Sequence, residues 1–241
     1  MNIAMWSGPR NLSTALMYAF AARGDCAVWD EPFYAAYLAC TGLDHPMRDA
    51  IIAAGETDAE VVARDCTRNT SDKPLFYQKH MCQHMVPGVP RDWLGAVRNV
   101  FLIRHPARVL ASFASKYEAA RLDDIGFVQQ DALYDAAAEM GREAPIVIDS
   151  SDILADPDAS LRALCGALGI EYSKSMLRWP AGAKPYDGVW APVWYGQVHR
   201  STGFQRGEAA LPVLAPPYDA VAEAAMPYYT RMKARALKIA G

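Results

Sequence analysis

The chain has 241 residues, of which 52% are hydrophobic and 21% are charged, and its formal net charge is −3. This composition excludes a disordered chain, because it holds enough apolar surface to form a packed core. No run of like charges occurs, so no nucleic-acid partner is expected, and a bound anion would need a few placed cations. The length fits one domain over residues 1–241.

No apolar stretch approaches the roughly 18 residues of a membrane span, and the first residues lack the basic and apolar regions of a signal peptide. The five cysteines are scattered and never form a Cys-x-x-Cys pair. This spacing indicates free thiols in a reducing compartment. We therefore expect a cytoplasmic protein with no membrane partner.

Strands and helices are predicted to alternate along the chain. Short apolar segments predict strands at residues 2–6, 26–29, 75–78, 100–103 and 146–148. Residues 100–103 are apolar without alternation, which is typical of a strand covered on both faces of a parallel sheet. Helical patterns cover residues 13–24, 44–69, 106–117 and 156–168, and a last helix is expected to kink or break at Pro227. Residues 179–204 are expected to be irregular. The alternation predicts an α/β fold with a largely parallel sheet.

The turn after the first strand is the first candidate binding site. In open α/β sheets, ligands lie beyond the carboxyl ends of the strands, and the free N–H groups of a helix N-terminus suit a phosphate. Arg10 adds a cation, and Ser13 and Thr14 add hydroxyl groups. The pattern G-x-x-x-x-G-K-[ST] is absent, so this is not a Walker A loop. A plain helix start capped by Ser13 or Thr14, with Arg10 in solvent, is the alternative.

A second candidate anion site follows the strand at residues 100–103. Arg104 leaves this strand at its carboxyl end, Pro106 opens the next helix, and Ser112 falls in the second turn of that helix. Arg104 and Ser112 can therefore face one anion. The alternative is an arginine that caps the sheet edge and a serine without a function. The sequence therefore holds two candidate anion sites, each at the carboxyl end of a predicted strand.

The segment Pro9-Arg10-Asn11-Leu12-Ser13-Thr14-Ala15-Leu16 resembles the P-R-S-G-T-T-L loop of the P-loop sulfotransferases, in particular of members with Arg in place of Lys, such as tyrosyl-protein and trehalose sulfotransferases. The resemblance implies a P-loop NTPase-like three-layer fold, with a largely parallel central sheet flanked by helices. It also implies the donor 3′-phosphoadenosine 5′-phosphosulfate (PAPS), with adenosine 3′,5′-bisphosphate (PAP) as product. Leu12 stands where the family usually has Gly, and because Leu resists positive φ, the loop is expected to differ in shape. The residues implied to hold the 5′-phosphosulfate are Gly8, Pro9, Arg10, Asn11, Leu12, Ser13 and Thr14.

Later motifs extend the resemblance. Arg104, Pro106 and Ser112 have the spacing with which the family holds the 3′-phosphate of PAPS. Residues 145–169 resemble the family's strand, its "YEDL…DP" segment and its helix ending in "LG". Ser150 stands there in place of a Tyr that often touches the cofactor, so this contact is expected to be weakened or lost. In the family, a basic loop closes over the 3′-phosphate. The residues at roughly this position in the chain are Arg200, Ser201 and Thr202.

Sulfuryl transfer needs cations at the leaving phosphate and a base at the acceptor hydroxyl. Arg10 is the first predicted cation, and Lys79 is the second because it resembles the Lys of the family's K-x-H segment. Glu31 lies about where Arg-type sulfotransferases place a catalytic Glu, and it is the favoured base. His80 is the rival base, since cytosolic members use a nearby His. Glu31 with Pro32 also fits a plain helix start.

Two features leave alternatives open. His80 and His84 would share a face if residues 78–85 were helical, but the other parts of a zinc motif are missing, so no metal is predicted. The aromatic residues between 179 and 195 can line an acceptor pocket, belong to the core or form a homodimer surface. We predict a PAPS-dependent sulfotransferase that acts on a small hydroxyl-bearing acceptor. The alternatives are a PAP-binding module without turnover and a P-loop kinase.

Overall fold

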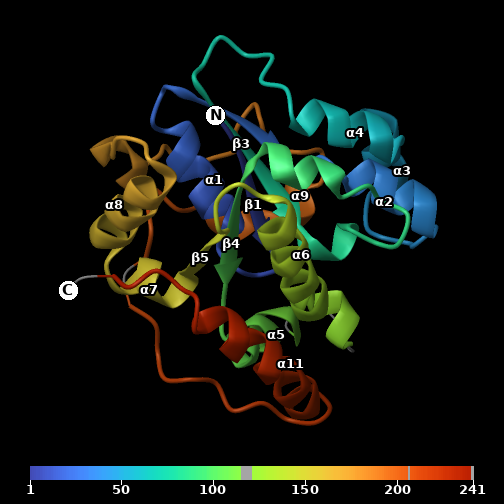
Figure 1. The fold of residues 1–241 in the computed structure, drawn as a ribbon. Coiled ribbons are helices and arrows are strands. Elements are labelled where there is room, and N and C mark those ends of the chain that lie inside the picture. The colour runs from blue at the N-terminus through green and yellow to red at the C-terminus, as the bar shows by residue number, and fades with distance from the viewer. Residues whose placement is uncertain (115–120, 206, 240–241) are drawn as a thin grey trace.

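In the computed structural model, which describes residues 1–114, 121–205 and 207–239, the chain folds around a five-stranded parallel sheet (Figure 1). The strand order is β2-β3-β1-β4-β5, so the first strand is central. The strands are β1 (Asn2–Ser7), β2 (Cys26–Asp30), β3 (Leu75–Met81), β4 (Arg98–Ile103) and β5 (Ile146–Asp149). Each of them contains one predicted segment, and the predicted α/β fold with a parallel sheet is confirmed.

Apolar side chains cover both faces of the sheet. On one face, Ile3 and Met5 of β1 pack in a cluster with Leu102 of β4. On the other face, Trp6 of β1 stacks on Phe101 of β4. All five side chains are fully buried. The unbroken apolar sequence of β4 is therefore explained by burial on two faces.

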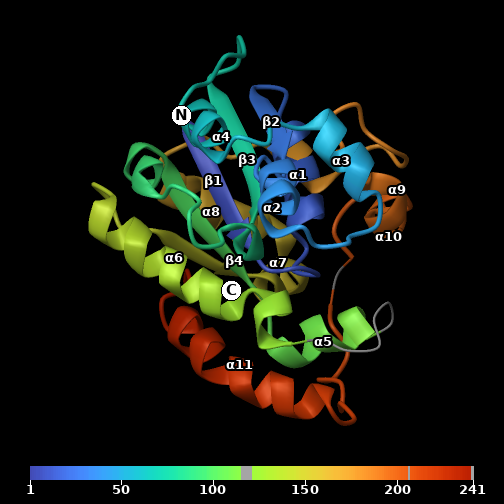
Figure 2. The same cartoon turned by 90° about the vertical axis from the view of Figure 1, so that its right-hand side faces the viewer.

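Helices form the two outer layers of the fold. α1 and α8 pack on the Ile3 face, whereas α4 and α6 pack on the Trp6 face. α11 lies along α5 and α6 (Figure 2). The α-helices are α1 (Ser13–Ala21), α2 (Tyr34–Thr41), α3 (Arg48–Ala54), α4 (Ala59–Cys66), α5 (Pro106–Ala114), α6 (Phe127–Met140), α7 (Ser150–Ala155), α8 (Pro157–Leu168), α9 (Ala191–Trp194), α10 (Gly196–His199) and α11 (Tyr218–Lys233). Short 3-10 helices are η1 (Cys82–His84), η2 (Asp92–Ala96), η3 (Leu122–Ile125) and η4 (Lys174–Leu177).

Several predicted helices differ in the structure. The pattern at residues 44–69 is divided into α3 and α4, because Gly55 ends one helix and Asp58 caps the next through its carboxylate. α11 continues through Pro227, where proline removes only one backbone hydrogen bond. The predicted end of α5 near Tyr117 lies outside the described residues. The region at 179–204 holds α9 and α10 within otherwise irregular chain.

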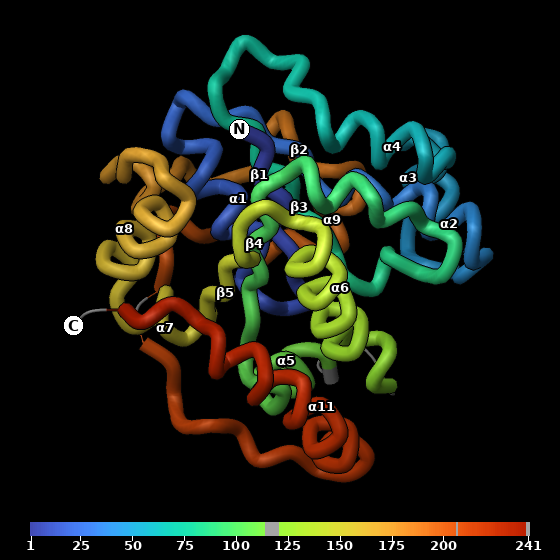
Figure 3. Tube along the Cα trace, viewed as in Figure 1, coloured from blue at the N-terminus to red at the C-terminus, as the bar shows by residue number. Residues whose placement is uncertain are grey.

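The carboxyl ends of the parallel strands lie at one edge of the sheet, where the predicted site residues follow. The chain at residues 207–217, which has neither helix nor strand, leads from this edge to α11 (Figure 3). It passes α7, where the N–H of Gly207 donates to the carbonyl of Leu154 at 2.8 Å. Among the described residues, no helix is both long and apolar enough to cross a bilayer.

We predict that Leu102→Ala destabilises the protein by about 2–5 kcal/mol, because it removes a fully buried side chain from the centre of the sheet. Urea unfolding of the whole chain measures this change. Leu211→Ala is the matched control, since Leu211 is 51% exposed, and its unfolding midpoint should stay at the wild-type value. Equal midpoints for the two variants would contradict the burial of β4 between β1 and β5.

Candidate active site

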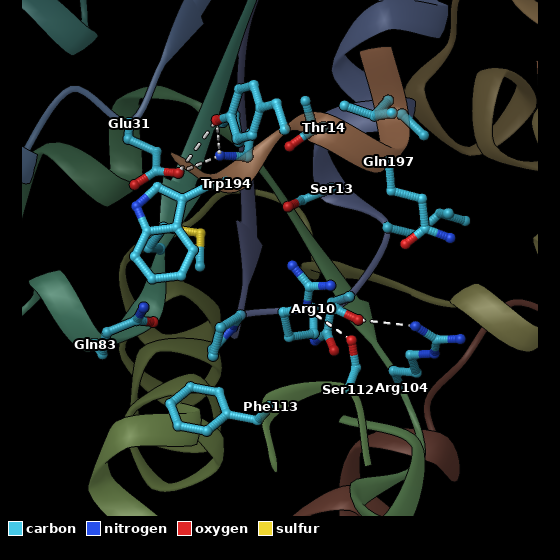
Figure 4. Close-up of a pocket in the computed structure, with 18 of the residues that line it drawn as sticks. Arg10, Ser13, Thr14, Glu31, Gln83, Arg104, Ser112, Phe113, Trp194 and Gln197 are labelled. Atoms are coloured by element: carbon cyan, nitrogen blue, oxygen red, sulfur yellow. Dashed lines mark hydrogen bonds and ion pairs between the residues drawn. The ribbon is translucent and has the colours of Figure 1, made fainter. Parts of the chain in front are cut away.

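A cavity of about 930 Å³ opens at the carboxyl edge of the sheet. Its walls include the chain at residues 9–15, the chain after β2, the end of β3, α5, and parts of the chain at residues 194–205 and 207–209. Figure 4 shows Glu31 and Trp194 at one end of the labelled group and Arg104 at the other, with Arg10 and Ser112 between them. The cavity therefore joins segments that are far apart in the sequence.

The loop between β1 and α1 has an unusual backbone. Arg10 and Leu12 adopt φ values of 61° and 71° without being glycine. Leu12 nevertheless takes the left-handed geometry directly before α1, so a Leu at this position does not keep the loop from this conformation. Its side chain packs against the apolar cluster on the Ile3 face, and this contact offsets the strain, which is about 1–2 kcal/mol.

The structure brings the two predicted anion sites together. The Nε of Arg10 donates to the Oγ of Ser112 at 2.7 Å, and the Nη1 of Arg104 donates to the carbonyl of Arg10 at 2.9 Å. All three residues line the cavity, as do Ser13 and Thr14 at the start of α1. The two turns thus present their cations and hydroxyl groups to one space, as the sequence predicts.

Other predicted residues of the first loop support its shape. Asn11 donates from its Nδ2 to the carbonyl of Leu102 at 3.3 Å, which ties the loop to β4, and Asn11 and Pro9 both line the cavity. Gly8 lies against the backbone of Ile125, whose carbonyl oxygen would collide with any Cβ at that position. Glycine is required there by close approach.

Arg104 has a second partnership that the sequence analysis missed. Its Nη2 lies 2.6 Å from Oε1 of Glu208, and the Nε of Arg108 lies 3.0 Å from Oε2 of the same carboxylate. Both arginines and Glu208 line the cavity. Arg108 follows Arg104 by one helical turn, which is the signal that could have identified it. Glu208 comes from irregular chain and gives no such signal.

The other end of the cavity holds a cluster of buried charges. The Nζ of Lys79 contacts Glu31 through a short hydrogen bond, Asp30 at 3.0 Å and the hydroxyl of Tyr195 at 2.9 Å. The side chains of Lys79 and Asp30 are each only 2% exposed, and that of Glu31 is 10% exposed. Three oxygens around one ammonium match its three N–H donors.

The charges in this cluster shift its pKa values. Burial raises the pKa of Glu31, although Lys79 opposes the shift. Burial alone would lower the pKa of Lys79, but the charges of Asp30 and Glu31 raise it overall, so the lysine stays protonated. Glu31 also has a φ of 44°, which places its side chain beside Lys79 by a strained backbone.

Tyr195 anchors the aromatic segment to this cluster. Its hydroxyl donates to Asp30 at 2.8 Å and accepts from the indole N–H of Trp190 at 3.1 Å. The N–H of Gly188 donates to the same carboxylate at 3.0 Å. Tyr195 and Trp194 line the cavity. Trp190 and Trp179 are buried in apolar clusters and are not among the described residues that line it. The segment therefore serves both as core and as cavity wall.

His80 and His84 lie in different environments. The ring of His80 stacks on that of Trp6 at 4.4 Å and forms a hydrogen bond with Gln78. His80 is only 2% exposed and is not among the described residues that line the cavity. Burial lowers the pKa of His80 to about 3. His84 lines the cavity with its Nε2 3.9 Å from Glu31.

The premise of a shared helix face for His80 and His84 is wrong, because β3 runs to Met81 and a 3-10 helix follows it. Tyr34 and Tyr37 both stack on the His84 ring, with centroid distances of 4.6 and 4.7 Å. Among the described residues, no group of three His, Cys, Asp or Glu side chains could hold a metal.

Of the remaining predicted residues, some line the cavity and others do not. Ser201 lines the cavity and accepts a hydrogen bond from Trp179, whereas Arg200 and Thr202 are exposed and absent from its described wall. Ser150 is fully buried, and its hydroxyl has no partner among the described residues. The structure therefore brings one member of the predicted 200–202 group to the cavity.

A parallel α/β sheet with a cavity at its carboxyl edge defines the class of α/β proteins that bind ligands where loops follow the strands. Residues 1–236 match the protein family described as Sulfotransferase domain, and the chain belongs to this family. Two Arabidopsis thaliana proteins, Branched-chain-amino-acid aminotransferase-like proteins 2 and 1, are 40% and 41% identical to it over 202 residues. The match covers 84% of this chain and 36% of each relative, so the chain spans about a third of their length.

Solved structures share the fold. The sulfotransferase from Alicyclobacillus acidocaldarius aligns with a TM-score of 0.60 at 10% identity, over 97% of this chain and 94% of that one. The sulfotransferase domain from the curacin biosynthetic pathway aligns with a TM-score of 0.50 at 15% identity, over 92% and 96%. These likenesses confirm the expected sulfotransferase fold.

We predict that Lys79→Met destabilises the protein by about 3–5 kcal/mol, because two buried carboxylates lose their cation. Without Lys79 the pKa of Glu31 rises further above its ordinary value of 4.5. A group with a raised folded-state pKa stabilises below its unfolded pKa, and this contribution is lost as pH rises through the folded pKa. The deficit against wild type should therefore grow from acidic to neutral pH.

Thermal unfolding as a function of pH measures this deficit. Lys174→Met is the control, since Lys174 is exposed and far from the cluster in the sequence. A deficit that stays constant with pH would show that Lys79 does not balance Glu31.

Proposed function

We propose that the protein transfers a sulfuryl group from PAPS to a hydroxyl group of a small-molecule acceptor. The observation that carries this proposal is the meeting, in one cavity, of Arg10, Ser112 and Arg104 with the buried pair of Glu31 and Lys79. Membership of the sulfotransferase family supports the type of reaction.

The arginine end of the cavity suits the donor. The N-terminus of α1 and the Arg10 guanidinium would hold the 5′-phosphosulfate. Arg104 and Ser112 would hold the 3′-phosphate. The Nε of Arg104 is buried without a hydrogen-bond partner among the described residues, and an anionic oxygen would satisfy this donor. The residues present therefore fit a nucleotide with two anionic groups.

The opposite end suits an acceptor hydroxyl. The donor PAPS would supply the sulfuryl group. Its transfer breaks the bond between sulfur and the phosphate oxygen and forms a bond between sulfur and the acceptor oxygen, so that PAP is the leaving group. Glu31 takes the acceptor proton on its carboxylate. Arg10 stabilises the charge that develops on the leaving phosphate. Tyr34 and Trp194 contribute aromatic wall on this side.

Lys79 is assigned a different task from the predicted one. Its three N–H donors face Asp30, Glu31 and Tyr195, so none is left for the leaving phosphate in this geometry. We assign Lys79 as the residue that positions Glu31. Asp30 neutralises part of the lysine charge, so that Glu31 keeps a pKa high enough to accept a proton. His80 is not assigned a role in proton transfer.

A nucleotide-binding module without turnover is the second candidate. The names of the Arabidopsis relatives, which are longer aminotransferase-like proteins, favour it. A P-loop kinase is disfavoured, since the Lys-Ser/Thr pair of a Walker A loop is absent from the first turn. Binding and turnover experiments separate these candidates.

We predict that PAP stabilises the wild-type chain by about 2.7 kcal/mol at ~100 times its Kd, and that ATP with Mg²⁺ does not. Arg104→Gln should weaken PAP binding by about 1.5–3 kcal/mol, because it removes a charged hydrogen-bond donor. Isothermal titration measures the affinity, and Arg178→Gln, an exposed arginine, is the control. Stabilisation by neither ligand would contradict the proposed donor.

We predict that Glu31→Gln lowers turnover by roughly 10²- to 10⁴-fold while PAP affinity stays unchanged, because the amide cannot accept the proton. Wild-type kcat/KM should rise with pH through a pKa above 4.5, since Glu31 must be ionised. Asp30→Asn should lower the pKa of Glu31, because the charge of Lys79 is then no longer shared with Asp30, and the rise of kcat/KM should therefore occur at lower pH. A labelled-sulfate assay over pH measures these effects.

Retained PAP binding with no turnover for any hydroxyl acceptor would favour the module without turnover. Loss of activity in His80→Ala but not in Glu31→Gln would show that Glu31 is not the base.

A further inference from the structure

The carboxylate of Glu208 lies where the arginine end of the cavity offers its charge. It contacts Arg104 at 2.6 Å and Arg108 at 3.0 Å, and its side chain is 10% exposed. The neighbouring carbonyl of Ala209 accepts from the Nη2 of Arg108 at 2.6 Å. The segment at residues 207–209, which we call the strap, therefore faces both arginines at once.

The donors that the strap uses are the ones a phosphate needs. The Nε and Nη2 of an arginine form one edge that can hold two oxygens of a carboxylate or phosphate side by side. In Arg108 the Nη2 donates to the carbonyl of Ala209, and the Nε forms an ion pair with the Glu208 carboxylate at 3.0 Å. In Arg104 the Nη2 is held by Glu208, while the buried Nε has no partner among the described residues. A phosphate can use this whole edge of Arg104 only when Glu208 releases it.

Charge leads to the same conclusion. Two guanidinium groups in a partly closed cavity repel each other unless an anion lies between them. Glu208 supplies that anion in this structure. A phosphate that carries about two negative charges would be repelled by the carboxylate if both stayed at the arginines. Carboxylate and phosphate therefore compete for one place.

The strap is suited to leave. It has neither helix nor strand, and the N–H of Gly207 donates a hydrogen bond to the carbonyl of Leu154 at 2.8 Å. Gly207 has a φ of 81°, a conformation that favours glycine. Displacement of Glu208 would therefore break its contacts with Arg104 and Arg108, and the ligand's phosphate would form equivalent contacts with the same two arginines.

We propose that Glu208 is a built-in substitute for a phosphate, which holds Arg104 and Arg108 in the ligand-free protein and is displaced by the 3′-phosphate of the bound nucleotide. Arg108 then becomes a second ligand of that phosphate. The identity of the nucleotide rests on the proposed function, whereas the competition between carboxylate and phosphate does not.

The test compares Glu208→Gln with wild type in isothermal titrations of PAP, adenosine 5′-monophosphate and inorganic phosphate. Glu208→Gln keeps the size of the side chain but removes the competing charge. We expect it to bind PAP roughly three- to tenfold more tightly, with no comparable gain for adenosine 5′-monophosphate. Glu223→Gln, an exposed glutamate on α11, removes the same charge elsewhere and should bind like wild type. Arg108→Gln should bind PAP more weakly than wild type.

The outcomes are distinguishable. Weaker or unchanged PAP binding by Glu208→Gln would overturn the proposal, because Glu208 would then orient the arginines rather than compete at them. An equal gain for the monophosphate would overturn it as well, since the effect would be one of general charge. If neither protein binds PAP, the proposed function fails, and inorganic phosphate decides the competition: tighter binding by Glu208→Gln supports it, and equal binding overturns it.

Discussion

The register between β2 and β3 is the constraint on which the site depends. Asp30 and Lys79 are direct partners across these strands, and β1 pairs with Lys79 from the other side. Lys79 is thus held in a buried inner strand, where its charge must be balanced within the protein. Asp30, Glu31 and Tyr195 provide this balance. One strand pairing therefore positions the proposed base and fastens the aromatic segment to the sheet.

Backbone strain gathers at the same edge. In the described part of the chain, the non-glycine residues with positive φ are Arg10, Leu12, Glu31 and Met47, and the first three line the cavity. Such conformations cost about 1–3 kcal/mol each and persist only where neighbours hold them. Arg104 holds the carbonyl of Arg10, and the backbone N–H of Glu31 donates to the carbonyl of Lys79 at 2.8 Å. The strand ends thus keep the proposed cation and base in place.

The sequence predicts the sheet well and the site in part, for physical reasons. Buried parallel strands are short apolar runs, and Arg10, Arg104 and Glu31 follow such runs closely, so their common edge could be foreseen. His80 could not be separated from Lys79 by type alone, but successive side chains of a strand point to opposite faces. Lys79 lines the cavity, and His80 packs on Trp6. Tyr195 and Glu208 reach the site through tertiary contacts of irregular chain, which have no periodicity to read.

The close approach of Gly8 to Ile125 has a consequence for how this loop tolerates change. The Cα of Gly8 also lies within 3.4 Å of the position that a side chain on Gly126 would take. The turn before α6 therefore supports the loop between β1 and α1 from behind, although nearly half of the chain separates the two in the sequence. With this outside support, the loop need not rely on a glycine at position 12 to hold its curve. A side chain added at Gly8 would collide with this support, whereas Leu12 is accommodated in the loop as it stands.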